Sequence, residues 1–285
     1  MLTRVDRVQV VVSDRSAAAA GFARLLDAAV VREDRVRLLG ARRAVLRLGS
    51  SEVELLEPDG TGLTGDFLAA TRGGLFAAGF ATPDVARLRA HLTASGVAFA
   101  EESDQLWLAP EALRVPGLRA VISRTAELPA SGLVQHLYEA TLLVQDFTAV
   151  VRDAASRFAL DASHFIPIRS HEFGYDGVLT LFDPDRLDRM EIITPNDPAK
   201  TMGRFFARRG ACWYMCYAEA ADLGPIRHRL MEHARDNWTG PREGTADNLF
   251  IHPKALGGMM LGVSRATHAW TWSGHPERVV AAGER

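Results

Sequence analysis

The sequence has only two cysteines, Cys212 and Cys216, among 285 residues. Secreted domains that depend on disulfides carry more cysteines than this, so we expect two buried free thiols. No run of about 18 apolar residues is present, which excludes a membrane-spanning helix. The first residues also lack the apolar core and the cleavage site of a signal peptide. These absences predict a cytoplasmic protein that has no membrane partner.

Neither sign of charge is in large excess. The 33 basic and 35 acidic residues give a formal net charge of −2, and the arginines are spread along the chain. A nucleic-acid-binding domain needs a clustered basic face, so we expect no nucleic-acid partner. Hydrophobic residues make up 47% of the chain, which is enough for two cores.

An internal repeat is the strongest positive feature. Residues 5–14 (VDRVQVVVSD) and 137–146 (LYEATLLVQD) are both β-prone runs that end in Asp and precede a helical pattern. We expect Asp14 and Asp146 to cap the helices that follow. Three strand-like segments come after each helix, at residues 28–36, 41–48 and 51–57 in the first unit and 163–171, 176–182 and 188–194 in the second.

Two further units follow the same order, starting at residues 74–84 and 211–222. The sequence therefore predicts an α+β protein with four βαβββ modules. A single module cannot bury a sheet face alone, so we expect the modules to pair. The polar segment 125–132 has the composition of a linker, which predicts an N-terminal domain at residues 1–126 and a C-terminal domain at 133–275.

The openings VQVVVSD and LLVQD, the strand endings VELLEPDG and MEIITPND, and the late phrase IHPKALGGMMLGV resemble the vicinal oxygen chelate superfamily, which includes glyoxalases, bleomycin resistance proteins and extradiol dioxygenases. The resemblance extends over about residues 4–267. It implies that paired modules form two cupped mixed sheets, and that a cup holds a divalent metal which chelates neighbouring substrate oxygens.

The resemblance also implies where metal ligands would lie: a His in the first strand of a module and a Glu or Gln in the last. These positions are Arg7 and Glu54, Ala77 and Ile122 or Ser123, Glu139 and Glu191, and Met215 and Gly262. None of them is His, so the usual set of two His and one carboxylate is missing. We therefore expect no cofactor, although a divalent metal at Glu139, Glu191 and His252 stays open as an alternative.

In the N-terminal cup, Arg7 and Glu54 are expected to face each other. An Arg beside a Glu can form a bidentate ion pair. The pair either fills a former metal site or presents Arg7 to an anion, and we favour the structural interpretation.

In the C-terminal cup, Glu139 and Glu191 are expected to converge, with no Arg at the equivalent positions. Two carboxylates in an apolar cup repel each other, so the pKa of one should rise, which suits a general acid or base. Alternatively, one of the two pairs with a nearby arginine, for which the candidates are Arg169, Arg189 and Arg204.

Alternation along residues 211–222 is expected to point Trp213, Met215 and Tyr217 into the same cup, as an aromatic lining for a flat organic ligand. His252 precedes the last strand of module four, in a loop that the resemblance places beside the cup. The polar segment 238–248 is either a lid or a surface loop.

Three functions follow from these features. The first is an isomerase or lyase that uses Glu139 or Glu191 as a base, assisted by His252, on a small oxygenated or aromatic molecule. The second is a non-catalytic binding or resistance protein, because the cup is kept while the ligands are lost. The third is a carboxylate-rich metal enzyme of the glyoxalase or dioxygenase type. A homodimer is compatible with all three.

Overall fold

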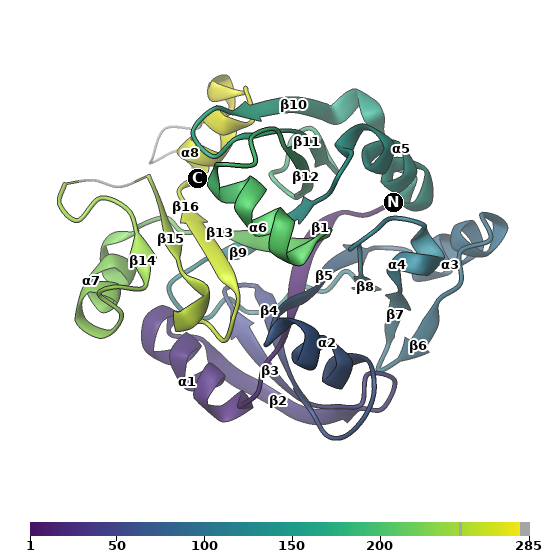
Figure 1. Cartoon of the computed structure of the whole chain (residues 1–285), viewed down its shortest axis with the longest axis horizontal. Coiled ribbons are helices and arrows are strands. Elements are labelled where there is room, and N and C mark those ends of the chain that lie inside the picture. The colour runs from purple at the N-terminus through teal and green to yellow at the C-terminus, as the bar shows by residue number, and fades with distance from the viewer. Residues whose placement is uncertain (245–246, 280–285) are drawn as a thin grey trace.

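The computed structural model describes residues 1–244 and 247–279, which form two eight-stranded mixed sheets (Figure 1). The first sheet has the order β2 (Ala29–Val36), β3 (Ala41–Leu48), β4 (Ser51–Pro58), β1 (Arg4–Val11), β5 (Gly74–Thr82), β8 (Ala120–Arg124), β7 (Gln105–Leu108) and β6 (Ala100–Glu102). The second has the order β10 (Phe165–Ser170), β11 (Tyr175–Leu181), β12 (Arg189–Pro195), β9 (His136–Leu143), β13 (Cys212–Glu219), β16 (Met260–Ser264), β15 (Asn248–Ile251) and β14 (Trp238–Thr239).

The two sheets share one topology. In the first, β1 is parallel to β4 and antiparallel to β5, and β5 is parallel to β8. In the second, β9, β12, β13 and β16 repeat this arrangement. Modules one and two therefore pair within the first sheet, and modules three and four within the second, which confirms the predicted fold of four βαβββ modules.

One helix follows the first strand of each module. These helices are α1 (Arg15–Leu26), α3 (Val85–Ala94), α5 (Phe147–Phe158) and α7 (Gly224–His233). The Asp14 carboxylate accepts a hydrogen bond from the Ala17 N–H, and Asp146 accepts from the N–H groups of Thr148 and Ala149. Both predicted N-caps are therefore confirmed.

The remaining helices were not predicted from the sequence. They are α2 (Leu63–Thr71), α4 (Pro110–Leu113), α6 (Thr201–Arg209) and α8 (Ala266–Trp272), with short 3₁₀ turns at Ala162–His164, Pro253–Ala255 and Pro276–Arg278. Helices α2 and α6 hold equivalent places, because each joins the last strand of one module to the first strand of the next. Of the helices in the described ranges, none has the length and apolar character needed to cross a membrane.

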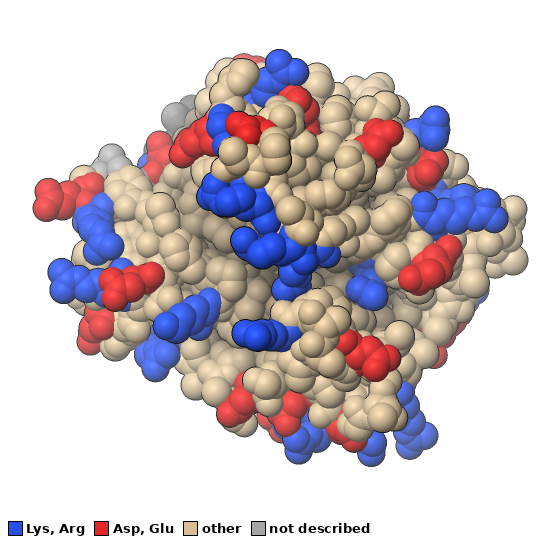
Figure 2. Space-filling model, viewed as in Figure 1, with Lys and Arg blue, Asp and Glu red and all other residues tan. Residues whose placement is uncertain are grey.

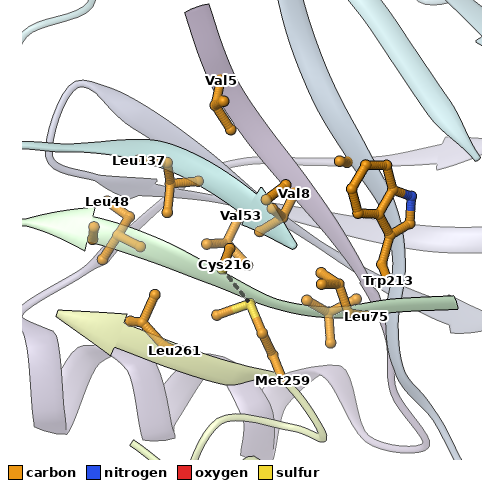
Figure 3. Packing of buried hydrophobic residues seen from close by; sticks show 14 of the residues in the cluster. Val5, Val8, Leu48, Val53, Leu75, Leu137, Trp213, Cys216, Met259 and Leu261 are labelled. Atoms are coloured by element: carbon orange, nitrogen blue, oxygen red, sulfur yellow. Dashed lines mark hydrogen bonds between the residues drawn. The ribbon is translucent and has the colours of Figure 1, made fainter. Parts of the chain in front are cut away.

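The largest hydrophobic core is shared by the two sheets (Figure 3). It joins Val8 and Val53 of the first sheet to Leu137, Cys216 and Leu261 of the second. Because side chains alternate across a strand, the intervening residues of the same strands point the opposite way. The cups of both sheets therefore open on the faces turned away from this shared core.

Candidate functional site

A cavity of about 560 Å³ lies in the cup of the second sheet. Strands β9 and β12 form its floor, β13 and β15 contribute an aromatic wall, and α6 and α8 contribute residues at its edges. The lining includes Tyr138, Glu139, Thr141, Tyr175, Arg189, Glu191, Met202, Tyr214, Met215, Tyr217, Phe250, His252, His268 and Trp272. The structure thus brings Glu139, Glu191, Met215, Tyr217 and His252 together, as the sequence predicted.

An ion pair lies at the floor of the cup. From the sequence, we expected Glu139 and Glu191 to converge with no arginine beside them. The register of β9 against β12 places Arg189 opposite Glu139, and the Arg189 Nε donates to Glu139 Oε2 at 2.7 Å. Arg189 Nη1 also donates to Ser273 Oγ at 2.9 Å. Both charged residues are about 1% exposed, so Glu139 is a paired carboxylate and Arg189 was correctly named among its candidate partners.

Glu191 lies opposite Thr141 and, within residues 1–244 and 247–279, forms no such ion pair. The Thr141 hydroxyl donates to Glu191 Oε2 at 2.7 Å, and the Tyr175 hydroxyl donates to Oε1 at 3.3 Å. Burial first, and then the negative charge of Glu139, raise the pKa of Glu191 to about 8. The Glu191 carboxyl group is therefore largely protonated at neutral pH, which matches the predicted rise of one carboxylate pKa.

The aromatic wall corrects one sequence prediction. Strand β13 has a register shift against β9 between Trp213 and Met215, and such a bulge changes which side chains share a face. As a result Tyr214 and Met215 both line the cavity, whereas Trp213 packs in the shared core (Figure 3). The Trp213 Nε1 donates to the Arg119 carbonyl at 2.7 Å, so Trp213 does not line the cup.

Tyr217 holds its place because a neighbouring residue is glycine. A Cβ atom at Gly262 would lie 2.2 Å from the Tyr217 ring, so only glycine leaves room for this ring. Within the described ranges the Tyr217 hydroxyl has no hydrogen-bond partner. Burial and the nearby Tyr138, Glu139 and Glu191 raise its pKa well above the ordinary value. Tyr217 therefore stays protonated and can donate a hydrogen bond to a ligand.

Two histidines lie at the rim of the cavity. The His252 Nε2 is 2.7 Å from the Thr239 hydroxyl, and the His268 Nε2 is 3.2 Å from Asn248 Nδ2. Burial lowers the pKa of His268, so its ring is neutral at neutral pH. His268 was not predicted, because α8 had no counterpart in the repeat. Thr141 could have been predicted, because it lies two residues after Glu139 and therefore on the same face of the strand.

The donor atoms in the cup do not fit a divalent metal of the kind that the resemblance implies. The candidates are Glu139, Glu191 and His252, but the Arg189 guanidinium already neutralises Glu139 at 2.7 Å. A metal ion on Glu139 would lie against this fixed positive charge. Among residues 1–244 and 247–279, no group of three His, Cys, Asp or Glu side chains is placed so that it could hold a metal.

Charged side chains occupy the floor of the N-terminal cup, beside a cavity of about 390 Å³ that Arg7, Glu52 and Gln105 help to line. Arg7 Nη1 donates to Glu54 Oε1 at 2.9 Å, as predicted, and Arg43 Nη1 donates to Oε2 at 3.3 Å. The amides of Gln9 and Gln105 donate to the same carboxylate at 2.7 Å each. Burial alone would raise the pKa of Glu54, but Arg7 and Arg43 hold it below the ordinary value. This saturated network favours the structural interpretation of the cup.

The two cups carry an Arg–Glu pair at equivalent positions, but with the two residues on opposite strands. Arg7 lies opposite Glu52 on β1 and β4, and Glu139 lies opposite Arg189 on β9 and β12. Both sheets therefore have an Arg–Glu pair at this position, with the Arg on the first strand of the module in the first sheet and on the last strand in the second. In the first sheet Glu54 has two arginine partners, whereas the equivalent Glu191 has hydroxyl partners only. This difference accounts for the opposite shifts of the two pKa values: the pKa of Glu54 is lowered and that of Glu191 is raised.

Comparison with known proteins supports the fold. Residues 6–106 match the family model described as the glyoxalase, bleomycin resistance protein and dioxygenase superfamily. A mutant of 4-hydroxymandelate synthase from Streptomyces coelicolor is similar over 98% of both chains, with a TM-score of 0.67 and 11% identity. No curated protein matches the sequence.

A xylose isomerase-like TIM barrel and 4-hydroxyphenylpyruvate dioxygenase fusion protein is similar over 98% of this chain and 52% of its own, with a TM-score of 0.64 and 11% identity. A methylmalonyl-CoA epimerase from Streptomyces coelicolor is similar over 44% of this chain and all of its own, with a TM-score of 0.40 and 22% identity. At these identities the matches at TM-scores above 0.6 establish the fold.

Proposed function

We propose that the protein is an isomerase or lyase that acts on a small oxygenated molecule in the C-terminal cup. The match of residues 6–106 to the glyoxalase, bleomycin resistance protein and dioxygenase superfamily supports this proposal. Glu191 is the acid–base catalyst. The observation that carries this proposal is a carboxyl group, Glu191, that is 4% exposed, bonded by the hydroxyls of Thr141 and Tyr175, and part of the lining of a cavity of about 560 Å³. Burial and the charge of Glu139 raise its pKa to about 8. A carboxyl group with a pKa near the working pH both takes and returns protons efficiently.

The reaction class follows from the groups around Glu191. The ionised carboxylate takes a proton from a carbon next to a substrate carbonyl, and the electron pair moves onto the carbonyl oxygen. The Tyr217 hydroxyl donates a hydrogen bond to the resulting enolate. Glu191, now protonated, returns the proton to another face or a neighbouring carbon in an isomerase. In a lyase, the electron pair instead expels a group from the next carbon.

The ligand class follows from the walls. Tyr214, Phe250 and Trp272 give the cavity a largely aromatic lining, which suits a flat organic body. The Tyr217 hydroxyl and the Asn248 amide can donate to substrate oxygens. We therefore expect a small aromatic carbonyl compound with an acidic C–H bond.

The test is proton exchange between a panel of aromatic carbonyl compounds and heavy water, followed by NMR. We expect the wild-type protein to incorporate deuterium next to the carbonyl, at a rate that rises with pH up to about 8, because the base is the ionised form. Glu191→Gln should slow this exchange by about 100-fold or more. The control is Glu232→Gln, an exposed position on α7.

Two outcomes would contradict the proposal. If Glu191→Gln exchanges at the wild-type rate, Glu191 is not the catalyst. If compounds raise the melting temperature but are never altered, the cup only binds them, and the protein is a binding or resistance protein.

A further inference from the structure

Basic side chains gather where the two sheets meet, away from the cup. Figure 2 shows Lys and Arg over the centre of this face, around α6 and towards α2, with Asp and Glu mostly towards its edges. Helix α6 carries Arg204, Arg208 and Arg209, and Arg72 is the C-cap of α2. Within the ranges 1–244 and 247–279, none of these arginines forms an ion pair with a carboxylate.

Arg119 is a half-buried cation beside this group of arginines. Its guanidinium carbon lies 4.8 Å from the centre of the Phe76 ring and 5.7 Å from that of Phe67. The guanidinium donates no hydrogen bond to any described residue. Burial lowers the pKa of Arg119, and only the charge of Glu111 opposes this. A half-buried cation without a counter-ion is costly, which points to an anion as the missing partner.

Arg209 reaches the same place from the second sheet. Its Nη1 donates to the carbonyl of Thr71 at 3.0 Å, and the Thr71 hydroxyl donates to the Phe67 carbonyl at 2.6 Å. Phe67 and Thr71 are one turn apart on α2, so the guanidinium groups of Arg119 and Arg209 both contact the last two turns of that helix. Arg72 follows immediately.

We propose that Arg72, Arg119 and Arg209 form a binding site for the phosphate group of a small phosphorylated molecule. Guanidinium groups match phosphate in charge and in geometry, because two N–H groups can donate to two oxygens. Arg72 and Arg119 come from the first sheet and Arg209 from the second, so a bound phosphate would bridge the two halves. The net charge of −2 disfavours a nucleic acid, which requires a broader basic surface.

The site is distinct from the proposed active site. Arg72, Arg119 and Arg209 are absent from the lining of the cup, whereas Met202 of α6 is part of it. Arg209 lies seven positions after Met202 on α6, which corresponds to about 10 Å along the helix axis. The proposal therefore does not depend on catalysis by Glu191.

The test is calorimetric titration with inorganic pyrophosphate at low salt. We expect saturable binding to the wild-type protein and an affinity about tenfold or more lower for Arg119→Gln, because charge-assisted hydrogen bonds are lost. Arg89→Gln is the matched control: it removes the same charge, but Arg89 is already paired with Glu101 at 2.8 Å. Equal affinities for the two variants would overturn the proposal.

Arg72→Gln provides a second test that cannot fail through misfolding, because Arg72 is exposed. It should weaken pyrophosphate binding about threefold or more, and an unchanged affinity would overturn the three-arginine site. A single-stranded oligonucleotide is the competing ligand. Binding that tightens with oligonucleotide length and exceeds the affinity for pyrophosphate would overturn the assignment to a small molecule.

Discussion

The replacement Glu191→Gln should stabilise the folded protein at neutral and alkaline pH. Glu191 is 4% exposed, and no cation from the described part of the chain is bonded to it. Its pKa is about 8 in the folded protein, against an ordinary value of 4.5. Between these values the folded state holds a proton that the unfolded state has released, so the wild-type protein loses stability as the pH rises. Glutamine mimics the protonated form and does not carry this penalty.

The magnitude follows from the two pKa values. Each unit corresponds to about 1.36 kcal/mol, so the variant should exceed the wild type by about 3 kcal/mol at pH 7 and about 5 kcal/mol above pH 8. Below about pH 4 both forms are neutral and the difference should vanish. Thr141 and Tyr175 can keep their hydrogen bonds to the glutamine side chain, because hydroxyl groups both donate and accept.

The assay is urea denaturation of both proteins between pH 4 and pH 9. Glu232→Gln, at an exposed position on α7, controls for loss of a surface carboxylate and should differ from the wild type by less than about 0.5 kcal/mol at each pH. A difference between Glu191→Gln and the wild type that does not grow with pH would refute the reasoning, because it would show that Glu191 is ionised in the folded state.

Other changes test the surrounding packing. Glu139→Gln leaves the Arg189 guanidinium buried without its counter-charge and should lower the free energy of unfolding by about 3–5 kcal/mol; a loss below 1 kcal/mol in urea denaturation would argue against the pair. Gly262→Ala should cost about 1–3 kcal/mol, since its Cβ meets the Tyr217 ring, and crystallography would show whether the ring has moved. Asp146→Ala should lower stability by about 1 kcal/mol through loss of the cap, measured by thermal unfolding.

The parts of the fold that repeat could be predicted from the sequence. Strand-like runs closed by Pro and Asp recur in each half, and β3 and β12 begin and end within one residue of the segments expected for them. Helices α2, α6 and α8 lie outside the βαβββ unit. Because these helices are not part of the repeat, the sequence did not predict them. The residues that α6 and α8 contribute to the cup were therefore not predicted either.

The candidate site was predicted where strict alternation holds. Alternation correctly placed Glu139 and Glu191 on the cup face. The same rule placed Trp213 on the wrong face, because a bulge in β13 reverses the alternation there. Pairing of Glu139 with Arg189 depends on the register of two strands distant in sequence. From the sequence, Arg189 was one of three candidate partners for a carboxylate in the cup. The strand register in the folded sheet shows that Arg189 is the partner of Glu139.

The central claim is that Glu191 is a carboxylic acid, not a carboxylate, at neutral pH in the C-terminal cup. Carbon-13 NMR titration of protein labelled at the Glu side-chain carboxyl carbons tests it directly, with the Glu191→Gln variant used to assign the signal. We expect one Glu resonance that titrates near pH 8 and is missing from the variant. A Glu191 resonance that titrates near 4.5 would contradict it.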